Sequence, residues 1–165
     1  MVKKGKGMKV FVKNRFTLAR GSKVLDENGK EVLKVKGKML SARRKKQICD
    51  LDGKVLYRVQ NKFWSMFLPS SYMLTADKKK IGRLVRKLGG KSKYVLQDFP
   101  DEISLDGGFF SGKVTVMRKG EPIGSIKAKF AFINDKFEVE GEEADIPFLV
   151  ALTIAMDNIR DRGRS

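Results

Sequence analysis

Lysine and arginine side chains gather in two short segments, and these are the residues of the sequence best suited to hold a ligand. The first segment contains Lys78, Lys79, Lys80, Arg83, Arg86 and Lys87, and the second contains Arg43, Arg44, Lys45 and Lys46. Arginine binds phosphate bidentately and lysine binds it as a point charge, so both segments predict anion-binding sites. A plain alternative is that these lysines only protect strand edges from aggregation.

A run of carboxylates lies closer to the C-terminus and offers a candidate cation site. The run extends from Asp135 to Asp145, and its candidate ligands are Asp135, Glu138 and Glu140. Carboxylate oxygens are the ligands that Ca²⁺ prefers, but the sequence has no calcium loop of the helix–loop–helix type. Carboxylates that precede a helix also complement its dipole without holding any metal. Both interpretations stay open at this point.

Residues for common catalytic chemistry are scarce. The sequence has no histidine and one cysteine, Cys49, which excludes histidine-based triads and zinc sites built from Cys and His. Cys49 lies in the β-prone run 47–49 and is expected to be a small buried apolar group. We find no convergent carboxylate pair and no glycine-rich phosphate loop. The sequence therefore predicts a protein that is not an enzyme and needs no cofactor.

The formal net charge of +17, from 36 basic and 19 acidic side chains, restricts the kind of partner. Such a charge attracts polyanions, namely anionic lipid, phosphorylated ligands or nucleic acid. It also serves plain solubility. We find no helix-turn-helix pattern and no RNA-stacking motif, which makes nucleic acid the weaker candidate.

A strand–turn–strand unit recurs along the chain and must position these side chains. Its turn and second strand recur at the segments 29–35, 53–59, 78–84 and 120–126, and a short β-prone run precedes each segment. Asn28-Gly29 and Asp52-Gly53 tolerate the positive φ angles of a type I′ turn, and β-prone runs flank them. Further short strands are expected at 38–40, 63–65, 94–96 and 103–105. About ten to twelve short strands favour a barrel or a sandwich.

The pattern changes near the C-terminus, where a helix is predicted over about 146–161. Asp145 can cap it, and Pro147 fits its first turn. Every residue from Ile146 to Met156 except Thr153 is apolar, so this helix must be buried on all sides. At ~1.5 Å per residue these residues span about 16 Å, roughly half of the ~30 Å hydrocarbon core of a bilayer.

The helix is therefore expected to be enclosed by the strands rather than by lipid. Its predicted core side chains are Phe148, Leu149, Leu152, Ile154 and Met156. Asp157 follows this apolar stretch. If the barrel covers Asp157, its charge needs a partner, such as an arginine of the barrel wall or a backbone donor. We expect instead that Asp157 marks the point where the helix leaves the barrel.

The sequence resembles the LURP-one-related family, in the superfamily of the Tubby C-terminal domain and the phospholipid scramblases. The matching segments are 26–30, 35–41, 50–59 and 148–157. The resemblance implies a mostly β fold, a closed barrel of roughly twelve strands around a central C-terminal helix. It implies a single domain over 9–162 after a basic tail, 1–8. Tubby-like relatives bind phosphoinositide headgroups, and scramblase relatives act on lipid.

The residues and the resemblance support two functions from different classes. The first is a non-catalytic binding or adaptor domain that docks on anionic phospholipid headgroups or phosphorylated ligands through the basic segments. The second is a nucleic-acid-associated or purely structural, protein-interaction domain. The segment Met1–Gly7 is basic without a following apolar run, so a secretory signal is not predicted. We expect a cytoplasmic protein without a transmembrane span, with peripheral docking at the inner membrane surface under the first function.

Overall fold

The computed structural model describes residues 5–13, 22–37, 45–62, 70–87, 93–108, 112–129 and 136–162. The strands are β1 (Gly7–Lys13), β2 (Ser22–Asp26), β3 (Glu31–Gly37), β4 (Lys46–Cys49), β5 (Val55–Asn61), β6 (Ser70–Thr75), β7 (Lys80–Lys87), β8 (Lys93–Gln97), β9 (Ile103–Gly108), β10 (Lys113–Arg118), β11 (Glu121–Lys129) and β12 (Lys136–Glu142). Two 3₁₀ turns, η1 (Pro100–Glu102) and η3 (Glu143–Asp145), precede β9 and the helix α1 (Ile146–Arg162).

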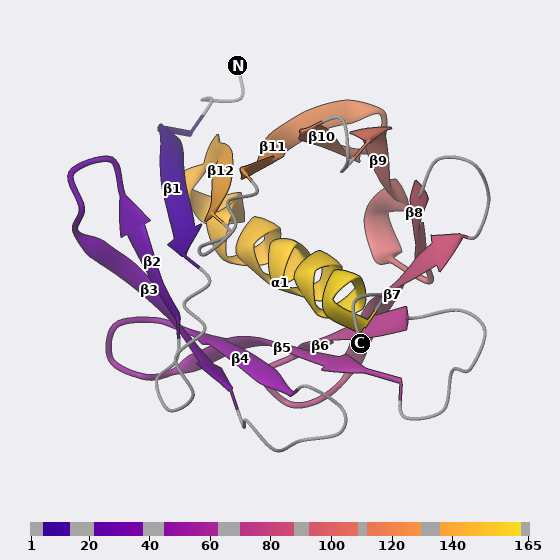
Figure 1. Cartoon of the computed structure of the whole chain (residues 1–165), viewed down its shortest axis with the longest axis horizontal. Coiled ribbons are helices and arrows are strands. Elements are labelled where there is room, and N and C mark those ends of the chain that lie inside the picture. The colour runs from indigo at the N-terminus through magenta and orange to yellow at the C-terminus, as the bar shows by residue number, and fades with distance from the viewer. Residues whose placement is uncertain are drawn as a thin grey trace.

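All twelve strands belong to one antiparallel sheet that curls around the helix (Figure 1). Its order is β8-β7-β6-β5-β4-β3-β2-β1-β12-β11-β10-β9, so β1 pairs with β12 and joins the two halves of the chain. The strands β8 and β9 end this order on either side, and the barrel is nearly closed. The predicted mostly β fold of twelve strands around a C-terminal helix is confirmed.

Alternation of side chains along each strand separates the core from the surface. In the β1–β12 pair, Val10 faces Val139 and Val12 faces Phe137, and all four are buried. Successive side chains point to opposite faces of a sheet. The residues between them therefore point outward, and Lys136 places its Nζ atom 4.2 Å from the ring centre of Phe11.

The helix is buried from every side, as its sequence predicts. The predicted core residues Phe148, Leu149, Leu152, Ile154 and Met156 are all buried. Thr153 is buried as well, and its hydroxyl donates to the carbonyl oxygen of Leu149 at 2.8 Å, which satisfies the polar group within the helix. In the part of the chain that the structure describes, no helix is long and apolar enough to span a membrane.

Three hairpin turns, β2–β3, β4–β5 and β6–β7, share one hydrogen-bond pattern. In the first, Gly29 N donates to Asp26 O at 3.1 Å and Asp26 N donates to Lys30 O at 2.8 Å. Gly29 has a φ of 78°, whereas the preceding Asn28 is not among the residues with positive φ. This is a type I turn that ends in a left-handed residue with a bulge in the strand pairing.

The predicted type I′ turn is therefore wrong for these three hairpins. It occurs in the fourth, β10–β11, where both Lys119 (φ 51°) and Gly120 (φ 78°) are left-handed. The side chain of Asp26 explains the difference, because its Oδ1 accepts from the backbone N–H groups of Asn28 and Lys30. A carboxylate that binds the turn in this way stabilises the type I geometry.

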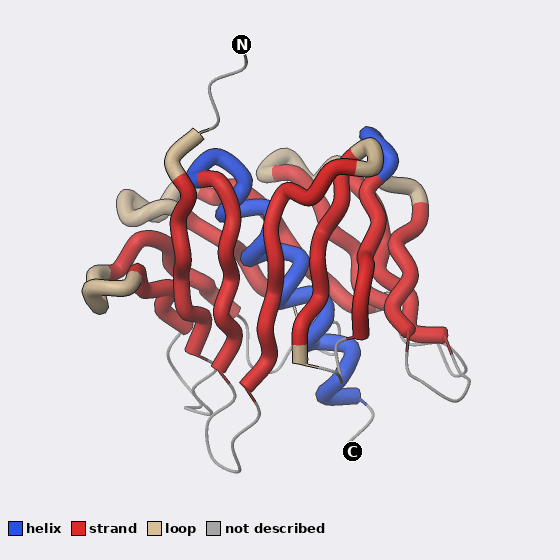
Figure 2. Tube along the Cα trace, turned by 90° about the horizontal axis from the view of Figure 1, so that it is seen from above, coloured by secondary structure: helices blue, strands red, loops and turns tan. Residues whose placement is uncertain are grey.

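The antiparallel order gives the barrel two distinct ends. The turns of the four hairpins and the beginning of α1 lie at one end, here called the turn end, and the helix runs from there towards the opposite end (Figure 2). At the turn end Arg118 Nη1 donates to Asp145 Oδ1 at 3.0 Å. The ring of Tyr57 lies 6.1 Å from that of Phe148, and burial raises the pKa of the Tyr57 hydroxyl.

The remaining expectations from the sequence concern four short strands and Cys49. The expected strands 94–96 and 103–105 lie within β8 and β9, whereas 38–40 and 63–65 lie outside the described residues. Cys49 is buried, in agreement with its expected role as a small apolar group.

Candidate functional site

The first basic segment extends along one hairpin, β6–β7, from the turn end towards the opposite end. Lys78 and Lys79 end the turn between the two strands, and both are exposed. Arg83 pairs with Tyr72 on the outer face, and Leu84, its neighbour, is buried in the core. Arg86 is on the same strand face as Leu84 by alternation. The side chains of the segment therefore do not form one cluster. Those of Lys78, Lys79 and Arg83 point outward, whereas that of Arg86 points inward. The strand β7 ends at Lys87.

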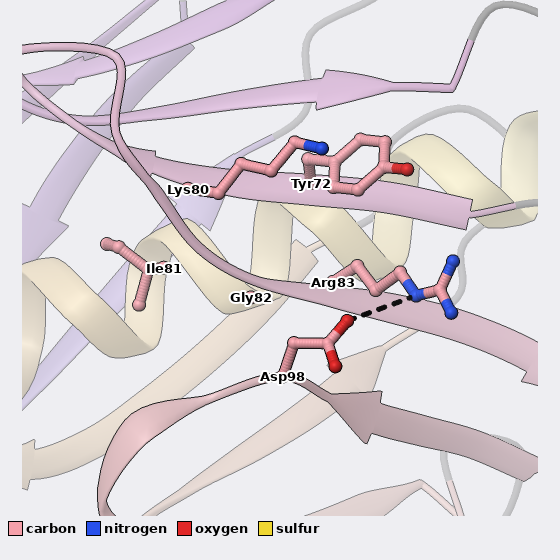
Figure 3. Close-up of a pocket in the computed structure, with 6 residues that line it drawn as sticks. All are labelled: Tyr72, Lys80, Ile81, Gly82, Arg83 and Asp98. Carbon is pink, nitrogen blue, oxygen red and sulfur yellow. Dashed lines mark ion pairs between the residues drawn. The ribbon is translucent and has the colours of Figure 1, made fainter.

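A pocket on the outer wall of the barrel collects part of this segment. It has a volume of about 340 Å³ and is lined by Tyr72, Lys80, Ile81, Gly82, Arg83 and Asp98 (Figure 3). Lys80 Nζ lies 4.5 Å from the ring centre of Tyr72, a distance at which a cation is attracted to the face of an aromatic ring. The wall of the pocket thus presents two cationic side chains around one ring.

A carboxylate completes the pocket. Arg83 Nε lies 3.6 Å from Asp98 Oδ2, and the two side chains are 35% and 79% exposed. That distance makes an ion pair but exceeds the length of a hydrogen bond, and Arg83 Nε has no hydrogen-bond partner among the described residues. Asp98 is a loosely held counter-ion, since exposed pairs of this kind are worth ~0–1 kcal/mol.

A β-bulge brings Lys80 to the outer face. Met73 pairs with Gly82, but the next residue, Leu74, pairs with Lys80, so one residue of β7 is extra. Without this bulge Lys80 would share the inner face with Gly82 and Leu84, because side chains alternate along a strand. The bulge re-aims the lysine towards Tyr72. Neither the ring nor the bulge is evident from the basic segment itself.

The position of Asp98 depends on the residue that follows it. The ring of Phe99 packs against Gly82 so closely that a Cβ atom there would lie 2.4 Å from Phe99 Cδ2. The same ring meets Phe148 of the helix edge-on, with 6.3 Å between ring centres. Asp98 itself has a φ of 61°, a conformation that aspartate tolerates better than most residues. Phe99 therefore anchors the carboxylate beside Arg83.

The second basic segment lies at the opposite end of the barrel. Lys45 is exposed, and Lys46 begins β4. Lys46 Nζ lies 4.0 Å from Asp157 Oδ2, with exposures of 25% and 1% for the two side chains. Arg43 and Arg44 lie outside the described residues. The two basic segments thus do not form a common site among the described residues.

Asp157 is buried, so the expectation that it marks the exit of the helix from the barrel is wrong. The helix remains enclosed through Asn158 and Ile159, which are buried as well. A buried carboxylate needs a compensating partner, and Lys46 reaches it from the strand wall. Asn61, also buried, donates from Nδ2 to the carbonyl oxygen of Asn158 at 3.2 Å.

Two of the three candidate cation ligands, Glu138 and Glu140, lie on β12 beside β1. Glu138 lies 3.4 Å from Lys9 Nζ, and this hydrogen bond, with the charge of Glu140, raises the pKa of Lys9. Asp135 lies outside the described residues. Within the described ranges, no three Asp, Glu or Cys side chains are grouped so that they could hold a metal ion. Lys9 supplies the charge opposite these carboxylates.

Besides Ile81 and Gly82, the sequence does not reveal Tyr72 and Asp98 as residues of the pocket. Tyr72 belongs to an ordinary β-prone run, and Asp98 comes from the connection after β8. Only the pairing of β6, β7 and β8 brings them to Arg83. In chemical terms the pocket can hold an anionic group at its lysine and arginine and a hydrogen-bond donor at its carboxylate.

Similarity to known proteins identifies the family of this chain. Curated proteins give no match to the chain. An X-ray structure of a protein from Arabidopsis thaliana is similar to it, with a TM-score of 0.62 and 12% sequence identity over 95% of this chain and 93% of that chain. At this identity the likeness concerns the fold. The family model described as LURP-one-related matches residues 8–157. The chain, matched over nearly all of its length, belongs to the LURP-one-related family.

Proposed function

We propose that this protein is a non-catalytic binding module that docks on anionic phospholipid surfaces through one hairpin. Membership of the LURP-one-related family points to a non-catalytic, Tubby-like domain. The observation that carries the proposal is a patch of outward cations on β6–β7. We call it the hairpin patch: Lys78, Lys79, Lys80 and Arg83. Each basic residue near an anionic membrane contributes about 1 kcal/mol of attraction.

The backbone of the hairpin patch supports this proposal. Lys78 has a φ of 66° and occupies the turn position that Gly29 and Gly53 hold in the two equivalent hairpins. A non-glycine residue in this conformation costs about 1–2 kcal/mol. Strained residues of this kind concentrate at functional sites. A lysine at this turn position, in place of a glycine, adds an exposed cation to the patch.

The surroundings of these lysines also favour an external partner. Among the described residues, the ion pairs do not include Lys78, Lys79 or Lys80, in contrast to Lys46 and Lys9, which have carboxylate partners. An unpaired surface cation keeps its full attraction for an incoming anion. In physiological salt the attraction of the patch acts within a Debye length of ~8–10 Å and is screened at larger distances.

The test is sedimentation with vesicles of neutral lipid, with and without an anionic phospholipid at fixed mole fraction. The chain should sediment only with the anionic vesicles, and K78E/K79E should weaken this binding by at least about 30-fold, because each lost lysine removes about 1 kcal/mol of attraction and each new glutamate adds repulsion. The matched control is K30E/K54E. Lys30 and Lys54 occupy the turn position of Lys79 in the other two hairpins, so this control changes the net charge equally and should weaken binding less than about threefold.

Equal sedimentation with neutral and anionic vesicles would refute the proposal. An equal loss in both double variants would assign the attraction to net charge rather than to the hairpin patch. Duplex DNA binding with a steep salt dependence, in a protein that ignores anionic vesicles, would favour the nucleic-acid alternative.

A further inference from the structure

The pocket that shares Lys80 and Arg83 with the hairpin patch carries both signs of charge, which a plain phosphate site does not need. Lys80 and Arg83 supply two cations, and Asp98 supplies one carboxylate. An anion with no hydrogen-bond donor would gain from the cations but would be repelled by Asp98. The complementary ligand has two anionic groups and one cationic donor, arranged around a short chain.

The geometry of the pocket leaves both cations available to a ligand although Asp98 lies beside Arg83. Asp98 meets Arg83 at its Nε atom, and the two terminal nitrogens of the guanidinium extend away from the carboxylate (Figure 3). A phosphate or carboxylate can bind those nitrogens bidentately. Lys80 lies over Tyr72, the residue that pairs with Arg83 across the strands. Two anionic groups of one ligand can thus contact one cation each, with the ring between them.

Asp98 is built into the site and is not a chance surface charge. Its neighbour Phe99 fills the space over Gly82 and contacts Phe148 of the central helix. The carboxylate is 79% exposed, so it can exchange Arg83 for a ligand donor at little cost. An ammonium group is the donor that gains most from such a carboxylate.

The volume of the pocket suits a small ligand. About 340 Å³ lies within the range of small-molecule sites and leaves room for a phosphate ester of serine. This ester carries a phosphate, a carboxylate and an ammonium group, which complement Lys80, Arg83 and Asp98.

We infer that this pocket recognises a serine phosphoester, with Asp98 as the residue that selects the ammonium group. The inference rests on the proposed docking at phospholipid surfaces, where this chemistry is the headgroup of phosphatidylserine. Lys78 and Lys79 then supply general attraction to the membrane, whereas the pocket supplies the choice of headgroup.

The experiment compares vesicles that contain phosphatidylserine with vesicles that contain phosphatidylglycerol at the same mole fraction. Both headgroups carry one net negative charge, but phosphatidylglycerol has no ammonium group. The unmodified chain should bind phosphatidylserine vesicles about fivefold more tightly, the upper end for one exposed ion pair. Asp98→Asn should reduce this ratio to about one, because binding to phosphatidylserine weakens and binding to phosphatidylglycerol does not.

Controls separate the pocket from general charge. Asp106→Asn removes an exposed carboxylate on β9 outside the pocket and should keep the fivefold ratio. Asparagine tolerates the positive φ of Asp98, and Asp98→Gly, which also fits that conformation, should lose the ratio in the same way. Soluble glycerophosphoserine should displace the chain from phosphatidylserine vesicles, and soluble glycerophosphoglycerol should not.

Equal binding to the two vesicle types, or a ratio unchanged in both Asp98 variants, would overturn the inference and leave the proposed docking intact. Binding to neither vesicle type beyond that to neutral lipid would overturn both. Tight binding of soluble glycerophosphoserine without vesicle binding would also overturn the proposed docking but would support the pocket, with a soluble phosphoester as its source.

Discussion

Two basic regions of the same chain, nearly indistinguishable in composition, have different environments in the fold. Lys46 begins a strand at one end of the barrel and reaches Asp157, a carboxylate that is 1% exposed. Lys80 begins a strand at the turn end and lies over the ring of Tyr72 on the outer wall. The first lysine compensates a buried charge, whereas the second keeps its charge available to solvent.

This difference shows that a run of basic residues has no fixed meaning until its neighbours are known. A charge opposite a buried carboxylate stabilises the fold, because its removal leaves that carboxylate with less compensation. A charge that faces an aromatic ring or solvent contributes little to folding. Substitutions at the two places should therefore separate stability from binding.

Lys46→Met should have the largest effect on stability. It removes the cation beside Asp157, and the free energy of unfolding should fall by about 1–3 kcal/mol, the cost of a buried polar group that loses a partner. Lys79→Met removes the same charge from the exposed turn, and the change should stay within ~0.5 kcal/mol. Urea denaturation followed by circular dichroism measures both.

Binding should follow the reverse order. Lys79→Met should weaken binding to anionic vesicles about fivefold, and Lys46→Met should leave it nearly unchanged. If the two variants are equally stable, Lys46 does not compensate Asp157 and the comparison fails.

Lys78→Gly should improve the fold at the expense of binding. Glycine relieves the positive φ of 66°, which costs a side chain about 1–2 kcal/mol, but it also increases the entropy of the unfolded chain. We expect a net stabilisation of about 0.5–1 kcal/mol in urea denaturation, together with severalfold weaker binding to anionic vesicles.

The converse substitution, Gly53→Lys, introduces the same strain in an equivalent hairpin. It should destabilise the chain by a similar ~0.5–1 kcal/mol. A Lys78→Gly variant less stable than the unmodified chain would show that the lysine is held there by contacts, not by function.

Tyr72→Leu should have the smallest effect. It removes the ring under Lys80, and cation–π contacts at exposed sites are worth about 0.5–1 kcal/mol. We expect roughly twofold weaker binding to anionic vesicles, measured by sedimentation, because the ammonium group is no longer held at the pocket. Tyr72→Phe retains the ring and serves as the control. Weaker binding in the Phe variant would instead assign the role to the hydroxyl.

Much of the fold is evident in local patterns. The apolar stretch from Ile146 to Met156 predicts a buried helix because none of its faces can meet water. The repeated turn segments predict short antiparallel strands because Asn28-Gly29 and Asp52-Gly53 reverse the chain without strain. Both features depend on residues that are close in sequence.

The turn type and the burial of Asp157 are harder to predict from the sequence. The type I geometry of the first three hairpins depends on the side chain of the residue that begins each turn. In the first hairpin this residue is Asp26, whose carboxylate accepts from backbone N–H groups of the turn. The burial of Asp157 depends on how far the strands extend along the helix and on Lys46, more than a hundred positions away. The hydrophobic periodicity of the chain predicts neither the length of the helix that the strands cover nor the contact between Lys46 and Asp157.

The sequence by itself determined the class of fold, the central helix and the scarcity of catalytic groups, since composition and hydrophobic pattern are properties of the chain alone. Only the tertiary structure decided which cations remain outward. A bulge turns Lys80 towards Tyr72, strand pairing brings Asp98 to Arg83, and the barrel assigns Lys46 to a buried carboxylate. These contacts join residues distant in sequence, so they exist only once the sheet has closed around the helix.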